Sequence, residues 1–326
     1  MDSQKLVISP APHVHGSNDT RRLMGDVLLA LLPALVVSVL AYGWQAFVVT
    51  AFSVACCVLV EWAVQKFLLK GPSTLGDMSA IVTGVLLGFN LPANIPLGLV
   101  AVGAIVAVGI GKMTFGGLGK NPFNPALVGR VFLLVAFPVA MTSFPEAVGA
   151  VSGATPLAMA KEALKAGVPV AEIMQSVDLS AMSLGMRSGS LGEISVVALL
   201  VGFVWLLVRR VISWHIPVCV LGTMALFSGI MWLISPAEYM NPLFHLLCGG
   251  AVLGAVFMAT DYVTSPMTKK GMVIYAVGIG VITMLIRLWG PYPEGMSFAI
   301  LIMNSVVPLI DKYVRPKRFG VVKSKK

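Results

Sequence analysis

The residue best suited to carry a covalently attached group is Thr155. It lies in the stretch Ser152-Gly153-Ala154-Thr155-Pro156, where two small neighbours leave its hydroxyl sterically open. Pro156 stiffens the turn and biases the residues before it away from helix. The pattern predicts a hydroxyl to which a bulky group could be esterified. An ordinary loop threonine before a proline has the same local sequence, so the motif alone leaves both interpretations open.

Four carboxylates lie at or near apolar segments, where ionisable side chains are costly and often mark ion pathways. Asp261 is the first candidate because it closes a short apolar segment, and Glu61 is the second. Asp77 stands at a predicted helix start, where N-capping is the competing interpretation. Asp311 adjoins Lys312, so an ion pair at the membrane interface is the alternative there.

The sequence Asn-Pro-Phe-Asn-Pro at 121–125 predicts a rigid entry into a helix. Asparagine side chains cap helix N-termini, and proline is favoured at the first helical position. Because helix N-termini attract anions, Asn121 and Asn124 could line a ligand site, or they could be no more than a cap at the bilayer surface. Arg130, expected near the inner end of the same helix, could bind a cofactor or anchor the helix at the interface.

The composition is that of an integral membrane protein. Of the 326 residues, 57% are hydrophobic and 11% are charged, whereas a soluble domain has about 25% charged residues. Apolar runs long enough to cross a bilayer as helices recur along the chain. The net charge of +9 comes from bases between these runs and in the C-terminal tail, a distribution that argues against nucleic-acid binding. The four cysteines fit no metal-binding pattern.

The apolar segments predict an all-α polytopic fold with about ten transmembrane segments. They lie at 23–42, 46–69, 79–90, 95–112, 126–142, 193–208, 211–234, 243–260, 271–289 and 296–311. The corresponding regions are an N-terminal arm (1–22), a first transmembrane repeat (23–142), a connecting loop that carries Thr155 (143–192), a second transmembrane repeat (193–311) and a basic tail (312–326).

A constant offset of 171 residues relates the two halves. It pairs Asn90 with Asp261, and it also pairs Gly109 with Gly280 and Pro122 with Pro293. Segments 79–90 and 243–260 end at these polar residues beside prolines, as broken helices do in transporters built from inverted repeats. Five crossings in each half would make the second repeat inverted relative to the first.

The basic residues predict the orientation. With the N-terminus inside and ten crossings, 19 of the 23 lysines and arginines fall on the inner side, including Lys112 and Arg130. Only Lys161, Lys165, Arg187 and Arg287 fall outside. Since cytoplasmic segments are enriched in these residues, we expect a multi-pass protein of the bacterial inner membrane with both termini cytoplasmic and the Thr155 loop on the outer, periplasmic face.

Four stretches spread along the chain resemble the NqrB/RnfD family. The likeness is to the RnfD membrane subunits of the Rnf ion-translocating oxidoreductase complexes and, more distantly, to the NqrB membrane subunits of the sodium-pumping NADH:quinone reductases. The stretches are 121–130 (Asn-Pro-Phe-Asn-Pro-Ala-Leu-Val-Gly-Arg), 152–158 (Ser-Gly-Ala-Thr-Pro-Leu-Ala), 257–261 (Phe-Met-Ala-Thr-Asp) with Ser265-Pro266, and 297–304 (Ser-Phe-Ala-Ile-Leu-Ile-Met-Asn). The resemblance implies a urea-transporter-like layout.

The same resemblance implies that the phosphate of FMN is joined to Thr155 through a phosphoester. Ser152, Gly153 and Ala154 would then give access to the attachment site, and Asn121, Asn124 and Arg130 become candidate flavin-lining residues. Many members also carry a second, noncovalent riboflavin, for which no residue here fixes a site.

The implied function is that of an electron-carrying membrane subunit in an ion-translocating ferredoxin:NAD⁺ oxidoreductase complex. The chain would receive electrons from a flavin subunit on the outer face, contact other membrane subunits and lipid, and couple electron transfer to Na⁺ or H⁺ movement. It would not turn over alone. The alternatives are a urea-transporter-like channel or permease without a redox role, and a purely scaffolding subunit.

Overall fold

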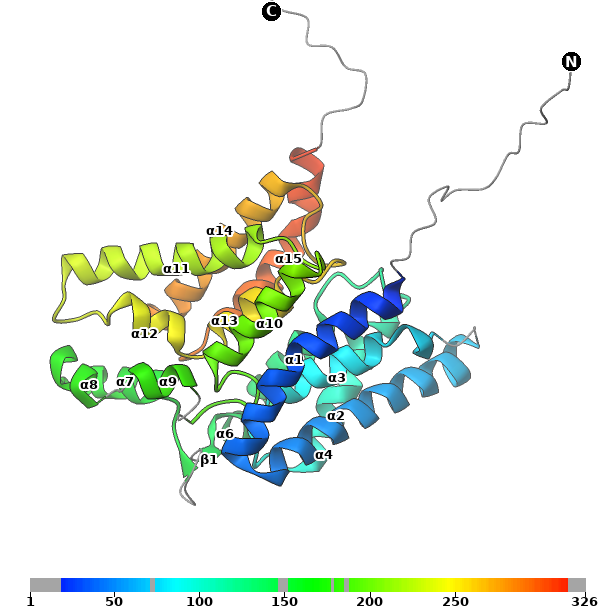
Figure 1. Ribbon diagram of the computed structural model, residues 1–326, viewed down its shortest axis with the longest axis horizontal. Coiled ribbons are helices and arrows are strands. Elements are labelled where there is room, and N and C mark those ends of the chain that lie inside the picture. Colours follow the sequence, from blue (N-terminus) through cyan, green and yellow to red (C-terminus); the bar gives the residue numbers. More distant parts are fainter. Residues whose placement is uncertain (1–18, 71–73, 146–151, 177–178, 185–187, 316–326) are drawn as a thin grey trace, which may run out of the picture.

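The computed structural model describes residues 19–70, 74–145, 152–176, 179–184 and 188–315. Most of these residues are helical, and six helices are long and apolar enough to cross a membrane (Figure 1). By helix length and composition the chain is therefore a multi-pass membrane protein. The predicted N-terminal arm and basic tail fall largely outside the described residues.

Helices in the first half follow the predicted segments closely. A π-helical turn, η1 (Val64–Leu69), extends helix α2 (Trp44–Ala63). Another, η3 (Ile105–Ile110), extends helix α4 (Leu97–Ala104). Two single turns, η2 (Leu75–Asp77) and η4 (Met113–Phe115), lie in the connections. The α-helices are α1 (Thr20–Tyr42), α2 (Trp44–Ala63), α3 (Ser79–Phe89), α4 (Leu97–Ala104) and α5 (Pro125–Ala136).

The second half contains three long helices and one broken helix. The break separates the short helix α12 from the short helix α13, and a π-helical turn continues α13. The elements are α10 (Val196–Val208), α11 (His215–Ile234), α12 (Pro242–Leu247), α13 (Ala251–Leu253), η5 (Gly254–Met258), α14 (Lys269–Trp289) and α15 (Met296–Tyr313).

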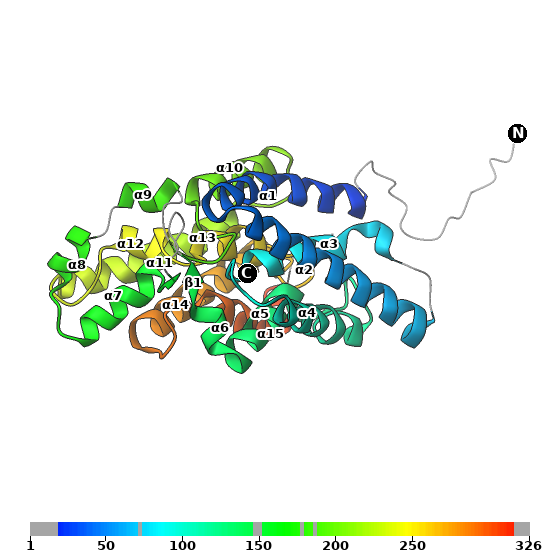
Figure 2. The same cartoon turned by 90° about the horizontal axis from the view of Figure 1, so that it is seen from below.

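Helix boundaries repeat at the offset of 171 residues. Helix α11 begins and ends 171 residues after α2, and α15 begins 171 residues after α5. The first helices of the halves, α1 and α10, pack side by side in both views (Figures 1 and 2), where Arg209 forms an ion pair with Asp26. The inverted relation of the halves stays a prediction, because it depends on the direction in which each helix crosses the membrane.

Small residues allow α3 to pack tightly against α2. A Cβ atom added at Gly84 would lie 2.5 Å from the Cα of Val54, and one at Gly88 would lie 3.1 Å from the Cα of Thr50. Such close backbone approach is typical of helix pairs in membranes. Helix α3 ends at Phe89, shortly before Pro92, which cannot continue a helix.

The predicted 143–192 loop is partly ordered into short elements. Helix α6 (Pro138–Thr142) follows α5, and strand β1 (Phe144–Pro145) pairs antiparallel with β2 (Ser152–Gly153). Helices α7 (Pro156–Lys165), α8 (Val170–Ser176) and α9 (Leu179–Leu184) come next. Figures 1 and 2 place α7 and α8 beside α11 and α12 at one end of the molecule.

Two basic residues assigned to the inner surface are instead buried. Lys112 is 1% exposed and Arg130 is 7% exposed, and each has an acidic partner. Arg130 is therefore not an interface anchor. A buried charge needs a partner to offset lost hydration, so these two residues belong to the interior polar network and carry no topological information.

Candidate functional site

A cavity of about 90 Å³ lies between the halves, and we name it the Asp261 cavity. Its walls come from α1, α3, α5, α10, η5 and the adjoining connections, so it depends on both halves. Most of its lining is apolar. The polar lining residues are Ser79, Thr83, Lys112, Asn121, Asn124, Thr260, Asp261 and Tyr262.

The two asparagines of the 121–125 stretch line this cavity from the start of α5. Asn124 Oδ1 accepts hydrogen bonds from the Ala126 and Leu127 amides at 3.1 and 3.4 Å, which confirms the predicted N-cap. Its amide nitrogen donates to the Met258 carbonyl of the other half at 3.2 Å. Asn121 Oδ1 is buried and has no hydrogen-bond partner among the described residues. An acceptor in this position suits a ligand that can donate a hydrogen bond.

Asp261 lies in the connection after η5, outside the membrane-spanning helices. Its carboxylate accepts from Thr264 Oγ1 at 3.1 Å and from the Val263 amide at 3.5 Å. Burial raises the pKa of this carboxyl, whereas the two hydrogen bonds and the charge of Lys112 lower it. The structure thus brings Asp261 and Lys112 into one cavity and one electrostatic environment.

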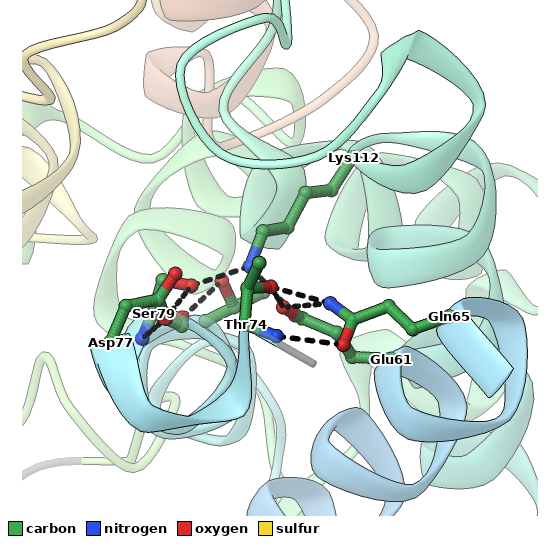
Figure 3. Close-up of polar contacts among 7 residues, drawn as sticks. Glu61, Gln65, Thr74, Asp77, Ser79 and Lys112 are labelled. Carbon is green, nitrogen blue, oxygen red and sulfur yellow. Dashed lines mark hydrogen bonds and ion pairs between the residues drawn. The ribbon is translucent and has the colours of Figure 1, made fainter. Parts of the chain in front are cut away.

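Glu61 forms the centre of a buried polar network (Figure 3). Lys112 Nζ donates to Glu61 Oε2 and to Ser79 Oγ, both at 2.6 Å. Ser79 Oγ in turn donates to Asp77 Oδ1 at 2.6 Å. On the other side, Gln65 Nε2 donates to Glu61 Oε1 at 3.2 Å. Both members of the ion pair are almost fully buried.

The remaining acid candidates have different positions. Asp77 Oδ1 also accepts from the Ser79 amide at 2.8 Å, so Asp77 caps the start of α3 and joins the Glu61 network. Asp311 lies near the end of α15 and accepts from the Met267 amide at 3.3 Å. Asp311 is therefore separate from the Glu61 network and does not line the Asp261 cavity.

Arg130 connects α5 to both halves. Its Nη1 donates to Asn90 Oδ1 at 2.6 Å, at the end of α3, and its Nη2 pairs with Glu294 in the connection before α15. Glu294 Oε1 is buried with no hydrogen-bond partner in the described part of the chain. An unpaired buried carboxylate oxygen is costly, so this atom is available to a ligand donor.

A second cavity, of about 320 Å³, brings Thr155 together with Arg130, and we name it the Thr155 cavity. Ala154 and Glu294 also line it. Thr155 is the N-cap of α7: its hydroxyl accepts from the Ala158 amide at 3.2 Å and is buried at the cavity wall. The helix begins at Pro156, within the region predicted to be a connecting loop. Ser152 and Gly153 lie in β2, just before this wall.

Lys161 holds α7 in place. Its ammonium donates to the carbonyls of Arg287, Gly290 and Tyr292 at 3.1, 2.5 and 3.1 Å, at the end of α14. Burial, and secondarily the charge of Lys165, lower the pKa of Lys161. These bonds dock the helix whose N-cap is Thr155 onto the second half.

The candidate cofactor residues therefore fall into two groups. Ala154, Thr155 and Arg130 share the Thr155 cavity, whereas Asn121 and Asn124 share the Asp261 cavity. Sequence reasoning missed Lys112 and Glu294 as site residues. The available signal for Lys112 was Glu61 itself, because a carboxylate at membrane depth needs a partner.

Comparison with known proteins identifies the relatives of this architecture. The NQR2, RnfD, RnfE family model matches residues 7–320. The chain belongs to this family. It is 44% identical to the D subunit of the Na(+)-translocating ferredoxin:NAD(+) oxidoreductase complex of Acetobacterium woodii, over 100% of this chain and 99% of the relative. It is 43% identical to the D subunit of the proton-translocating ferredoxin:NAD(+) oxidoreductase complex of Clostridium ljungdahlii, over 97% and 96%.

A more distant relative is the D subunit of the ion-translocating oxidoreductase complex of Escherichia coli O7:K1, which is 38% identical over 96% of this chain and 98% of the relative. The resemblance to the RnfD family is confirmed. The names of two relatives with nearly equal identity specify different ions, so identity alone does not select Na⁺ or H⁺.

Proposed function

We propose that this chain is the membrane subunit of an Rnf-type, ion-translocating ferredoxin:NAD⁺ oxidoreductase complex, with FMN esterified to Thr155. Full-length similarity to the D subunits of such complexes supports the assignment to a complex. The single observation that supports the flavin is the Thr155 hydroxyl, which faces a cavity also lined by Arg130.

The residues around Thr155 fit a phosphate ester. A volume of about 320 Å³ lies at the lower end of the roughly 300–1,000 Å³ of ligand sites. The N-terminus of α7 provides amide N–H groups, and a phosphate would compete with Glu294 for the guanidinium of Arg130. Pro156 and the docked Lys161 hold the hydroxyl at the wall. When bound, FMN would supply one- and two-electron redox chemistry.

A second, noncovalent flavin would have to widen the Asp261 cavity, because its volume of about 90 Å³ lies below the roughly 300–1,000 Å³ of ligand sites. The unpartnered Asn121 Oδ1 offers an acceptor to a ring N–H, and the side chain of Asn124 closes the same wall. The apolar lining from α1, α3 and α10 suits the faces of an aromatic ring. Riboflavin, which has no phosphate, matches a cavity of this character.

The ion-coupling role rests on three acids near the Asp261 cavity. Asp261 lines the cavity, the buried Glu61 contacts its wall through Lys112, and the half-buried Asp77 contacts its wall through Ser79, so a cation could exchange with charged side chains there. The proposed partners are an electron-donating flavin subunit at the Thr155 face and further membrane subunits along the lipid-facing helices. The proposed setting is the bacterial inner membrane, with both termini cytoplasmic and Thr155 on the outer side. Family membership favours this function over a channel or permease without a redox role.

Covalent flavin on a denaturing gel tests the assignment. The chain, co-expressed with its partner subunits and a flavin-attaching enzyme, is boiled in detergent, separated and viewed under ultraviolet light. We expect a fluorescent band that Thr155→Ala removes, because no other hydroxyl lies at the N-cap of α7. Mass spectrometry should assign the added mass to the peptide that contains residues 152–158.

Thr142→Ala is the matched control, since Thr142 lines the same cavity and its hydroxyl donates only to the Pro138 carbonyl among the described contacts. This variant should keep the fluorescent band. A wild-type band that stays dark, or a Thr155→Ala band that stays bright, would show that the flavin assignment is wrong.

A further inference from the structure

Lys112 stands between Glu61 and the Asp261 cavity. Lys112 and Ser79 line that cavity, whereas Glu61 lies behind them and does not line it. Glu61 is fully buried, and its Oε2 contacts the Lys112 ammonium at 2.6 Å (Figure 3). Any cation that reaches Glu61 from the cavity must therefore take the place of Lys112.

We infer that Lys112 is a tethered counter-cation that holds the carboxylate of Glu61 until a monovalent cation, Na⁺ or H⁺, exchanges with it. This inference rests on the proposed coupling of electron transfer to ion movement. The exchange breaks the Lys112–Glu61 ion pair and forms a cation–carboxylate contact or an O–H bond on Glu61. One positive charge replaces another, and no electron moves in this step.

The buried setting requires a one-for-one exchange. A carboxylate in a low-dielectric interior is strongly destabilised without a positive partner. Glu61 is thus occupied either by the ammonium or by the incoming cation. The protein supplies the competing charge covalently, so the competitor cannot diffuse away, and the affinity for the external cation is set by the strength of this one ion pair.

Ser79 can hold the displaced Lys112 ammonium by a hydrogen bond. Its oxygen accepts from Lys112 Nζ at 2.6 Å while its proton goes to Asp77 Oδ1. Lys112 can therefore leave Glu61 and keep one hydrogen bond at the cavity wall. Asp261 lines the same cavity and is within electrostatic reach of Lys112. The flexible four-carbon side chain of lysine suits a movement of this kind.

On the side away from the cavity, Glu61 is hydrogen-bonded to a chain of polar side chains. Its Oε1 accepts from Gln65 Nε2 at 3.2 Å and from Thr74 Oγ1 at 3.3 Å. Gln65 Nε2 also donates to Thr74 Oγ1 at 2.5 Å, and Thr74 is exposed. The ion pair thus separates an exposed polar chain from the cavity, as expected for an exchange point.

Only the first half carries this pair. At the offset of 171 residues, the counterparts of Glu61 and Lys112 are Trp232 and Thr283. A feature required for the fold of both halves would be expected in both. The charged and titratable groups near the pair are Asp77 behind Ser79, Asp261 across the cavity, and Cys57 one turn before Glu61.

The test measures the cation dependence of ferredoxin-driven NAD⁺ reduction by the complete complex. We expect Lys112→Met to lower the half-saturating Na⁺ concentration at least tenfold, a shift that corresponds to about 1.4 kcal/mol. Lys112→Arg keeps the charge and can pair with a carboxylate through two hydrogen bonds, so it should raise that concentration. Lys120→Met, which removes an exposed lysine of the same connection, should leave it unchanged.

A second measurement, the pH–rate profile, distinguishes Na⁺ from H⁺ as the transported cation. If H⁺ is the transported cation, neither the wild type nor the variants will respond to Na⁺. Instead, the pH–rate profile of Lys112→Met will differ from that of the wild type, because the tethered competitor for the proton at Glu61 is gone. Unchanged Na⁺ dependence together with an unchanged pH profile in both Lys112 variants would overturn the inference.

This failure differs from failure of the proposed function. If the wild-type complex shows covalent flavin and electron transfer while the Lys112 variants behave like wild type, only the counter-cation role is wrong. If the wild-type chain has no covalent flavin, the proposed function itself fails. Should Lys112→Met not assemble, Lys112→Arg decides, because a stronger competitor raises the half-saturating concentration at an unchanged maximal rate, whereas loss of the site lowers the maximal rate.

Discussion

Arg130 Nη1 donates to Asn90 Oδ1 at 2.6 Å, and this bond joins the Thr155 cavity to the end of α3. The other terminal nitrogen of the guanidinium pairs with Glu294 from the second half. A single side chain thus contacts the break in the first repeat, the cavity proposed for FMN, and the connection before α15. A change of charge in the cavity therefore acts directly on the contact between the two halves.

Arg130→Gln should destabilise the protein because it leaves the Glu294 carboxylate buried without its partner. Loss of one member of a buried ion pair costs about 3–5 kcal/mol, and Glu294 will be near the lower end since it is partly exposed. Arg130→Gln with Glu294→Gln should recover most of the loss. Thermal unfolding of the purified complex in detergent measures both, and a double variant no more stable than the single would contradict a direct pairing.

Gly84→Ala should weaken the packing of α3 on α2. The added methyl group would meet the Val54 backbone at 2.5 Å, and backbone atoms cannot move aside as a flexible side chain can. We expect a loss of about 1–3 kcal/mol. Gly98→Ala, at a helical glycine with no atom near the added Cβ, is the control and should be neutral in the same unfolding measurement.

Asn124→Ala should reduce noncovalent flavin without changing the covalent band. The substitution removes the N-cap of α5, worth about 1 kcal/mol, and the bond to the Met258 carbonyl. Acid extraction releases noncovalent flavin, and gel fluorescence reports the ester-linked flavin. Asn124→Asp keeps the capping oxygen and loses the donor to Met258. An equal loss of both flavins in Asn124→Ala would argue against separate sites.

Lys161→Met should lower flavin attachment at Thr155 although the two residues lie in different turns of α7. Its three hydrogen bonds dock the helix on α14, and hydrogen bonds from a charged group contribute about 1.5–3 kcal/mol each. Lys165→Met is the control on the same helix, because Lys165 is exposed. Fluorescence of the covalent band relative to protein measures the effect. Similar bands in the two variants would mean that docking by Lys161 does not position Thr155.

Much of the fold follows from the sequence because its signals are local. Apolar segments predicted the positions of α1, α2, α11 and α14, and the offset of 171 residues anticipated the matching boundaries of the halves. The Asn-Pro pair at 124–125 predicted the start of α5 with its cap. Each of these features depends on residues within one helix, on hydrogen bonds near its ends, or on simple hydropathy.

The sequence by itself determined the family and the helical segments, since these are encoded in contiguous residues, and Thr155 as the residue for attachment stays a prediction. Only the tertiary structure decided which distant side chains meet. Lys112 follows an apolar segment, and its position in the sequence was interpreted as that of a base on the inner side. Folding instead brings it to Glu61, 51 residues away in the sequence. Arg130 similarly meets Asn90 and Glu294. The reason is physical: a buried charge is stable only beside its partner, and that partner is chosen by the packing of helices from both halves.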